Sequence, residues 1–203
     1  MKFINKGEEP ESFAIWKALE NEEWQPSYSE LSNPEKKDIY NALLRDQGFI
    51  CCYCESEITN GDYHLEHLNP QSAEEGDDLD FNNFLCSCLK NTSKGDPLHC
   101  GKEKADEILE VHPLQPNCQD YFTFTADGKI QGENVGAKNS IRVLALDLGK
   151  LNDLRANALD PFLDPDLSEQ ELAEFVNKYI EDKEMLSPFI SAVKCVFNGY
   201  IQR

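Results

Sequence analysis

Glu66 and His67 stand side by side in the segment HLEHLNP, where a carboxylate and an imidazole could act on one substrate. Hydrolysis of a phosphodiester needs a deprotonated water in line with the leaving oxygen, and positive charge to stabilise that oxygen. A glutamate can bind a hard cation such as magnesium, and a histidine can take the proton from water. We interpret the pair as the centre of a metal-assisted hydrolytic site. A Glu-His dipeptide also arises by chance, so the surrounding motifs decide whether this one marks a catalytic site.

His64 precedes Glu66 by two residues, so both side chains share one face if the segment is a strand. On that face His64 is either a further ligand of the catalytic metal or a hydrogen-bonded structural residue. Pro70 should end the strand just beyond the pair.

Seven of the eight cysteines fall between Cys51 and Cys118, which suggests metal ligands in a reducing compartment. Cys51 and Cys54 have the two-residue spacing with which one turn grips a tetrahedral ion, and Cys88 and Cys100 can supply the other half. The four predict a structural Zn²⁺ site. Three further cysteines could replace a proposed ligand or be small buried apolar residues, namely Cys52, Cys86 and Cys118.

A local group of lysines lies around the second cysteine pair of this otherwise acidic chain. We expect phosphate contact from three of them, with a solvated loop as the alternative: Lys94, Lys102 and Lys104. The acidic stretch AEEGDDLD at 73–80 is expected to be a solvated loop and is given no role.

The formal net charge of −19 argues against a protein that holds nucleic acid on its own surface. It predicts instead a complex, in which a basic partner or nucleic-acid scaffold presents the substrate. No apolar run is long enough to cross a membrane, and the N-terminus lacks the apolar core of a signal peptide, so we expect a cytoplasmic protein.

Three segments are expected along the 203 residues. An N-terminal helical segment covers 1–48, with helices at 12–19 and 34–47, the second opened by Ser32-Asn33-Pro34 and ended by Gly48. The zinc-bearing catalytic module covers 49–112. The region 113–203 should begin with a hairpin around Asp127-Gly128 and continue as helices, one with a capping box at Ser168 and Glu171 and the last opened by Ser187-Pro188, and serve as a partner-docking surface.

The ordered motifs CCYCE, HLEHLNPQS, LDFNNFLCSC and HCGKEK, with the later NSIRVLALDLGKLNDLR and the opening MKFINKGEEPESFAIWK, resemble the HNH endonuclease family associated with retrons and Septu-type antiphage systems. The resemblance implies an α+β fold, with an HNH ββα-metal nuclease core and a structural zinc site flanked by N-terminal and C-terminal helices. It implies a Mg²⁺- or Mn²⁺-dependent endonuclease, with DNA favoured over RNA such as tRNA, acting as the effector of an antiphage complex. The implied partners are an ABC-type ATPase and a reverse transcriptase with its RNA–DNA product.

The resemblance also implies roles for individual residues. Glu66 matches the acidic metal ligand, His67 the general base, and Asn83 the middle asparagine that orders the loop bearing the base. The third metal-facing position is usually Asn or His near the second cysteine pair, and here Gly101 stands there instead. Asn91 is the preferred replacement, because His99 lies beside a proposed zinc thiolate.

A second hypothesis remains open from the sequence: a catalytically inactive, zinc-stapled adaptor whose acidic surface binds a basic partner protein. In that case Glu66 and His67 would be structural. Nuclease activity in a zinc-containing preparation distinguishes the two hypotheses.

Overall fold

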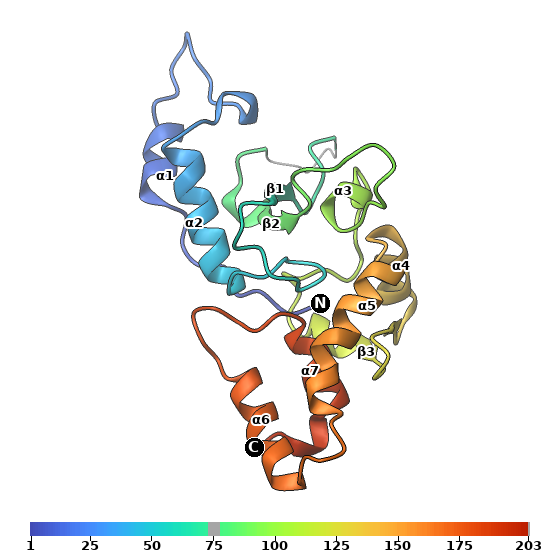
Figure 1. The fold of residues 1–203 in the computed structure, drawn as a ribbon. Helices are drawn as coiled ribbons and strands as arrows, with labels where there is room; N and C mark the ends of the chain where they lie inside the picture. The colour runs from blue at the N-terminus through green and yellow to red at the C-terminus, as the bar shows by residue number, and fades with distance from the viewer. Residues whose placement is uncertain (73–77, 203) are drawn as a thin grey trace.

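The computed structural model describes residues 1–72 and 78–202 (Figure 1). Its strands form two antiparallel pairs, β1 (Tyr63–His67) with β2 (Phe84–Cys88), and β3 (Phe122–Phe124) with β4 (Ile130–Gly132). The helices are α1 (Glu11–Lys17), α2 (Glu35–Gln47), α3 (Gly101–Lys104), α4 (Val135–Val143), α5 (Gly149–Leu159), α6 (Glu169–Ile180) and α7 (Ile190–Val196). Short 3₁₀ turns are η1 (Tyr28–Glu30), η2 (Phe81–Asn83), η3 (Cys118–Tyr121), η4 (Asp160–Phe162) and η5 (Asn198–Tyr200). The mixture of helices and small sheets agrees with the predicted α+β class.

The N-terminal helices follow the prediction, and α2 packs on the hairpin that carries the site. It ends where Gly48 adopts the left-handed conformation, with φ of 67°. No side chain within 1–72 and 78–202 caps its N-terminus, so the side-chain cap predicted at Ser32-Asn33-Pro34 was wrong; Pro34 itself occupies the cap position. The Gln47 side chain bonds the backbone of Cys86 on both its N–H and its carbonyl, which fixes α2 against β2.

The predicted hairpin is confirmed as β3 and β4, joined by a turn at Asp127-Gly128. Gly128 has a φ of 77°, and a side chain there would collide with the Asn152 carbonyl and lie 2.7 Å from the Ala156 nitrogen. The glycine therefore serves both the turn and the close approach of α5. Arg155, 2% exposed, completes this contact by donating to the Gly128 carbonyl at 3.0 Å.

The C-terminal helices match the prediction in part. The capping box of Ser168 and Glu171 opens α6 as expected. The leucine-rich segment at 141–155 is shared by α4 and α5, and between them the freed Leu144 carbonyl accepts from Cys100 N–H at 2.8 Å. The last helix, α7, begins at Ile190 instead of at Pro188 because Phe189 is left-handed, with φ of 54°.

Figure 1 shows α1 and α2 on one side of the β1–β2 hairpin and α3 on the other. One apolar cluster runs from the first residues through this hairpin to α5, and a second lies among η4, α6 and α7. None of the helices within 1–72 and 78–202 is both long and apolar enough to cross a bilayer.

Candidate metal-binding and nuclease site

The four cysteines predicted to bind zinc lie together in the interior. Their sulfur atoms are all within 4.8 Å of one another in the set Cys51, Cys54, Cys88 and Cys100. Two thiolates on a tetrahedral zinc with bonds of about 2.3 Å lie about 3.8 Å apart, and the Cys54 and Cys88 sulfurs are 3.8 Å apart. The cluster could thus hold a structural metal such as zinc. The three competing cysteines, Cys52, Cys86 and Cys118, are buried outside this group.

Burial and hydrogen bonding shift the pKa values of the clustered thiols in opposite directions. The Cys88 N–H points at the Cys51 sulfur at 3.5 Å, and the His99 Nδ1 lies 3.2 Å from the Cys100 sulfur. Burial alone would raise the pKa of the Cys51 thiol, but hydrogen bonds from the neighbouring thiols, led by Cys100, outweigh it and hold that pKa well below its usual range. Burial raises the pKa of Cys100. His99 therefore touches the thiolate cluster, as its position beside Cys100 suggested.

The paired strands decide which side chains meet α3. In the register of β1 and β2, His64 lies opposite Ser87 and Glu66 opposite Leu85, so His64, Glu66 and Ser87 share one face. The Ser87 hydroxyl accepts the Gly101 N–H at 3.0 Å and so holds the first residue of α3 over this face. The same hydroxyl lies 4.0 Å from the Cys51 sulfur, which connects the face to the cysteine cluster.

Glu66 is the centre of this face, and the residue is 6% exposed. Its Oε1 accepts from the Tyr53 hydroxyl at 3.1 Å and pairs with the Lys104 ammonium at 3.3 Å. Its Oε2 lies 3.5 Å from Nε2 of His64. The two oxygens therefore have different surroundings: Oε1 is held by protein donors, and Oε2 faces an imidazole nitrogen.

The Oε2 and Nε2 atoms, 3.5 Å apart, could share a divalent ion after a small shift of either side chain. Two donors bound to one ion at about 2.1 Å lie about 3.0 to 3.4 Å apart, depending on the coordination geometry. The other ring nitrogen of His64, Nδ1, is buried without a hydrogen-bond partner among the described residues, so the ring has unused bonding capacity. A side chain on Gly101 would lie 2.8 Å from Nε2 and closer still to Oε2, so the glycine keeps this space open.

His67 lies on the opposite face of β1 from Glu66, because neighbouring strand residues alternate. Its ring packs edge-on against Tyr28 and Phe84, with centroids 4.7 and 4.9 Å away. Nε2 is 3.2 Å from the Asp78 carbonyl oxygen, a pairing that requires the proton on Nε2 and leaves the lone pair on Nδ1. Burial lowers the pKa of His67, which favours the neutral ring.

Asn83 clamps the chain that follows His67. Its Oδ1 accepts the Asn69 N–H at 2.8 Å, and its Nδ2 donates to the Asn69 carbonyl at 3.0 Å. The Asn83 carbonyl accepts the Leu68 N–H at 2.9 Å. These are the contacts expected of a residue that orders the loop after the base, while its contribution to catalysis stays a prediction.

Asn91 is placed away from Glu66. It donates through its backbone and its side chain to Asp62, just before β1, whereas Glu66 lies near the other end of that strand. At about 3.3 Å per strand residue the separation exceeds the reach of one asparagine side chain. The structure brings His64, and not Asn91, to the Glu66 carboxylate.

The lysines predicted to contact phosphate differ in their surroundings. Lys94 and Lys102 are exposed, so phosphate contact by them stays a prediction. Lys104 is 1% exposed, and its ammonium also donates to the carbonyls of His67 and Ala105. Two of the three ammonium protons are used by these carbonyls, and the ammonium also pairs with Glu66, so phosphate contact by Lys104 stays a prediction. Of the acidic stretch at 73–80, the residues 73–77 lie outside the described part.

The sequence interpretation missed the two partners of the Glu66 Oε1 atom. Tyr53 lies between the zinc-turn cysteines Cys51 and Cys54, and Lys104 closes the one-turn helix that starts after Cys100. Each residue was visible inside a metal-binding motif. The sequence does not show that either side chain points toward Glu66, because this depends on how the two halves of the cysteine cluster meet.

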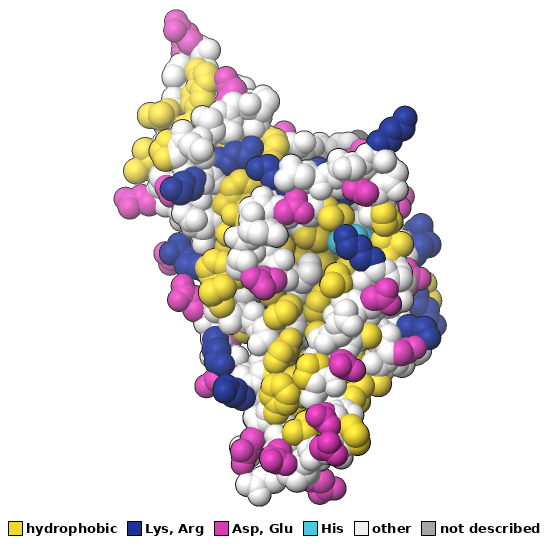
Figure 2. Space-filling model, viewed as in Figure 1, with side chains coloured by type: hydrophobic (Ala, Val, Ile, Leu, Met, Phe, Trp, Pro, Cys, Tyr) yellow, Lys and Arg dark blue, Asp and Glu magenta, His cyan; other side chains and the backbone are white. Residues whose placement is uncertain are grey.

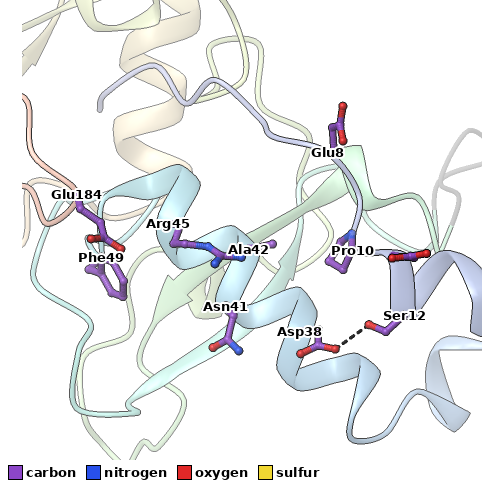
Figure 3. Close-up of a pocket in the computed structure, with 10 residues that line it drawn as sticks. Glu8, Pro10, Ser12, Asp38, Asn41, Ala42, Arg45, Phe49 and Glu184 are labelled. Atoms are coloured by element: carbon purple, nitrogen blue, oxygen red, sulfur yellow. Dashed lines mark hydrogen bonds between the residues drawn. The ribbon is translucent and has the colours of Figure 1, made fainter.

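A groove of about 600 Å³ lies elsewhere on the molecule, between the N-terminal segment and α2, and Figure 3 shows residues that line it. Its lining includes Glu8, Glu11, Asp38, Arg45 and Glu184, and the Ser12 hydroxyl donates to Asp38 across it at 2.7 Å. None of the residues that line it belongs to the Glu66 site or to the cysteine cluster.

Comparison with known proteins supports the nuclease interpretation of this geometry. No family model matches the chain. It is 30% identical to the "Retron Vc95 putative HNH endonuclease" of Vibrio cholerae serotype O1 biovar El Tor, over 58% of each chain, and thus spans less than two thirds of that protein. It is 25% identical to the "Retron Ec83 putative HNH endonuclease" of Escherichia coli, over 80% of each chain. The chain is related to proteins named as retron HNH endonucleases. Neither name mentions Septu.

Proposed function

We propose that the chain is a metal-dependent endonuclease of the HNH type, in which His64 and Glu66 hold one divalent cation and His67 accepts the proton of the attacking water. The observation that supports this most directly is the 3.5 Å approach of His64 Nε2 to Glu66 Oε2 beneath the bare Gly101. It lies in a chain related to proteins named as HNH endonucleases. We take Mg²⁺ or Mn²⁺ as the cation, because oxygen and imidazole are suitable ligands for either.

When bound, the divalent ion supplies positive charge for the phosphate and the leaving oxygen. The residues of the chain supply orientation and proton transfer. Glu66 Oε2 and His64 Nε2 fix the position at which the phosphate binds. The Asp78 carbonyl holds the His67 tautomer whose Nδ1 can take a proton from water. Because Glu66 and His67 lie on opposite faces of β1, we infer that the phosphodiester crosses the end of this strand to meet both.

The substrate and partners are also part of the proposal. Figure 2 shows acidic side chains over the visible face, gathered most densely at the end formed by η4 and α6. Exposed carboxylates there are Asp160, Asp164, Asp166, Glu169, Glu171 and Glu174. An acidic end repels nucleic acid and suits a basic protein surface. We propose that the chain acts as the effector of an antiphage complex with an ABC-type ATPase and a reverse transcriptase carrying its RNA–DNA product, with DNA the favoured target over RNA.

Substitution of His67 tests the proposal in the assembled complex. His67→Ala should lower cleavage about a hundredfold or more, because a general base contributes at least that much to the rate. Zinc content should be that of the unchanged protein, and the thermal midpoint should fall only slightly, since the half-buried ring packs against Tyr28 and Phe84. Glu66→Gln should also be inactive, and His112→Gln, a half-buried histidine outside the site, serves as the control.

Two results would count against the proposal. Undiminished cleavage by His67→Ala would remove this residue as the base. A zinc-containing wild-type complex that cuts neither DNA nor RNA across a range of magnesium and manganese concentrations would favour the adaptor function instead.

A further inference from the structure

We infer that Lys104 controls the metal affinity of the Glu66 site. Its buried ammonium offsets the Glu66 charge and occupies Oε1. The chain alone then binds a divalent cation weakly, and an anionic phosphate completes the site. This inference rests on the proposed function, because it concerns the metal held by Glu66 and His64.

The Lys104 ammonium is buried among protein oxygens. Lys104 is 1% exposed, and its ammonium lies 3.3 Å from Glu66 Oε1, 3.1 Å from the His67 carbonyl and 3.3 Å from the Ala105 carbonyl. Glu66 is itself 6% exposed. A buried ion pair of this kind is screened little by solvent, so each charge acts strongly on its neighbours.

The two carboxylate oxygens of Glu66 are not equally available to a cation. Tyr53 and Lys104 together hold Oε1, at 3.1 and 3.3 Å. Only Oε2 is turned toward His64, so Glu66 can offer a cation one oxygen and not two. The protein therefore provides two donor atoms, one of them a neutral imidazole, while hard divalent cations take six or more ligands. The remaining positions fall to water and to the oxygens of a phosphate.

The negative charge of Glu66 and the positive charge of Lys104 cancel, so the cation meets no net negative charge from this pair. With the cation in place the group carries a charge of about +2, which attracts a phosphate anion. Metal and phosphate should consequently bind with positive coupling, each raising the affinity for the other.

The position of Lys104 is tied to the cysteine cluster. α3 begins directly after Cys100, and Lys104 is its fourth residue. Tyr53 lies between Cys51 and Cys54, so both residues that hold Oε1 are positioned by cysteines within four residues of them in sequence.

Calorimetric titration of the zinc-loaded full chain with Mn²⁺ tests the inference without any cleavage step. Loss of a unit positive charge a few ångströms from a divalent cation should tighten its binding by about tenfold or more. We expect this gain in both Lys104→Met and Lys104→Gln; the second keeps a hydrogen-bond donor to Glu66 and guards against misfolding of the first. Lys138→Met removes an exposed lysine of α4 and should leave Mn²⁺ affinity within about twofold, since solvent screens it.

Two further variants separate charge from geometry. Tyr53→Phe releases one hydrogen bond from Oε1 but removes no charge, so it should tighten Mn²⁺ binding much less than Lys104→Gln does. Inorganic phosphate, used as the substrate-like anion, should tighten Mn²⁺ binding to the unchanged protein more than to Lys104→Gln, whose metal-loaded site carries one positive charge less.

The outcomes distinguish this inference from the proposed function. Unchanged or weaker Mn²⁺ binding in both Lys104 variants, with Glu66→Gln still abolishing it, would overturn the role of Lys104 and leave the nuclease site standing. A gain in Tyr53→Phe equal to that in Lys104→Gln would overturn the charge argument. Mn²⁺ binding that Glu66→Gln does not affect would remove the metal site itself, and the proposed function with it.

Discussion

Gly101 is the residue at which one added methyl group should do most harm to the site. The position of that methyl group lies against both proposed donor atoms, Glu66 Oε2 and His64 Nε2, and the Ser87 hydroxyl holds the Gly101 N–H. The Gly101 backbone and the Glu66 carboxylate cannot move apart easily, because Ser87 holds the first and Tyr53 and Lys104 hold the second.

We therefore expect Gly101→Ala to weaken Mn²⁺ binding at least tenfold and to abolish cleavage while the protein keeps its zinc. Calorimetry and metal analysis of the same sample measure both. Gly149→Ala is the matched control, since no atom of the described residues lies within 4 Å of a side chain there. Normal Mn²⁺ affinity in Gly101→Ala would show that the cation binds elsewhere.

Residue types and spacing predicted the cysteine set that the structure brings together, because a two-residue spacing between cysteines is typical of a metal-binding turn. The role of Glu66 stays a prediction. Residue types and spacing did not predict Lys104 as its partner, nor the separation of Asn91 from it. Asn91 belongs to the segment between β2 and Cys100, and spacing alone does not say whether such a segment folds back over the strand or away from it. In the structure Asp62 holds it away.

At the level of elements, α3 is a helix of four residues. A helix this short is not stable on its own. Its place over β1 and β2 depends on Cys100 at its start, on the Leu144 carbonyl that accepts the Cys100 N–H, and on Ser87. The metal expected at the cysteine cluster therefore supports the Glu66 site as well as the core.

Removal of zinc should consequently disrupt both the Glu66 site and the core around the cysteine cluster. Cys54→Ser is expected to lose zinc, to lower the thermal midpoint and to lose Mn²⁺ binding at Glu66. Cys86→Ser, which changes a buried cysteine outside the cluster, should keep its zinc. Because zinc binds thiolates, acidification protonates its ligands, so zinc affinity falls as pH falls. Metal analysis, with calorimetry for Mn²⁺, measures the effect; retention of Mn²⁺ binding by zinc-free protein would separate the two sites.

The sequence predicted most elements but not their mutual orientation. The hairpin turn, the end of α2 and the capping box of α6 depend on Gly128, Gly48 and Ser168, whose conformations are set locally. The break between α4 and α5 is not local, because it provides a carbonyl for Cys100, 44 residues away in sequence. The same holds for the face of β1 that α3 covers.

For the whole molecule, the charge of −19 limits what the chain can do unaided. Affinity for nucleic acid comes largely from lysine and arginine releasing counterions, and carboxylates oppose it. We expect the isolated chain to show no measurable binding to a DNA duplex at physiological salt in fluorescence anisotropy. The assembled complex should bind, with an affinity that falls steeply as salt rises. Tight, salt-sensitive binding by the chain alone would contradict the need for a partner.

The antiparallel pairing of β1 with β2 makes the molecule unequally tolerant of different kinds of sequence change. A substitution on this hairpin alters one side chain and leaves the others in place. Loss or gain of a single residue within β1 would shift the alternation, turning Leu65 and His67 toward α3 and sending Glu66 into the apolar side beside Phe84. Substitutions in this hairpin should therefore change the site by different amounts from one position to the next. An insertion or deletion of one residue would instead exchange the side chains that face α3 with those that face the apolar side.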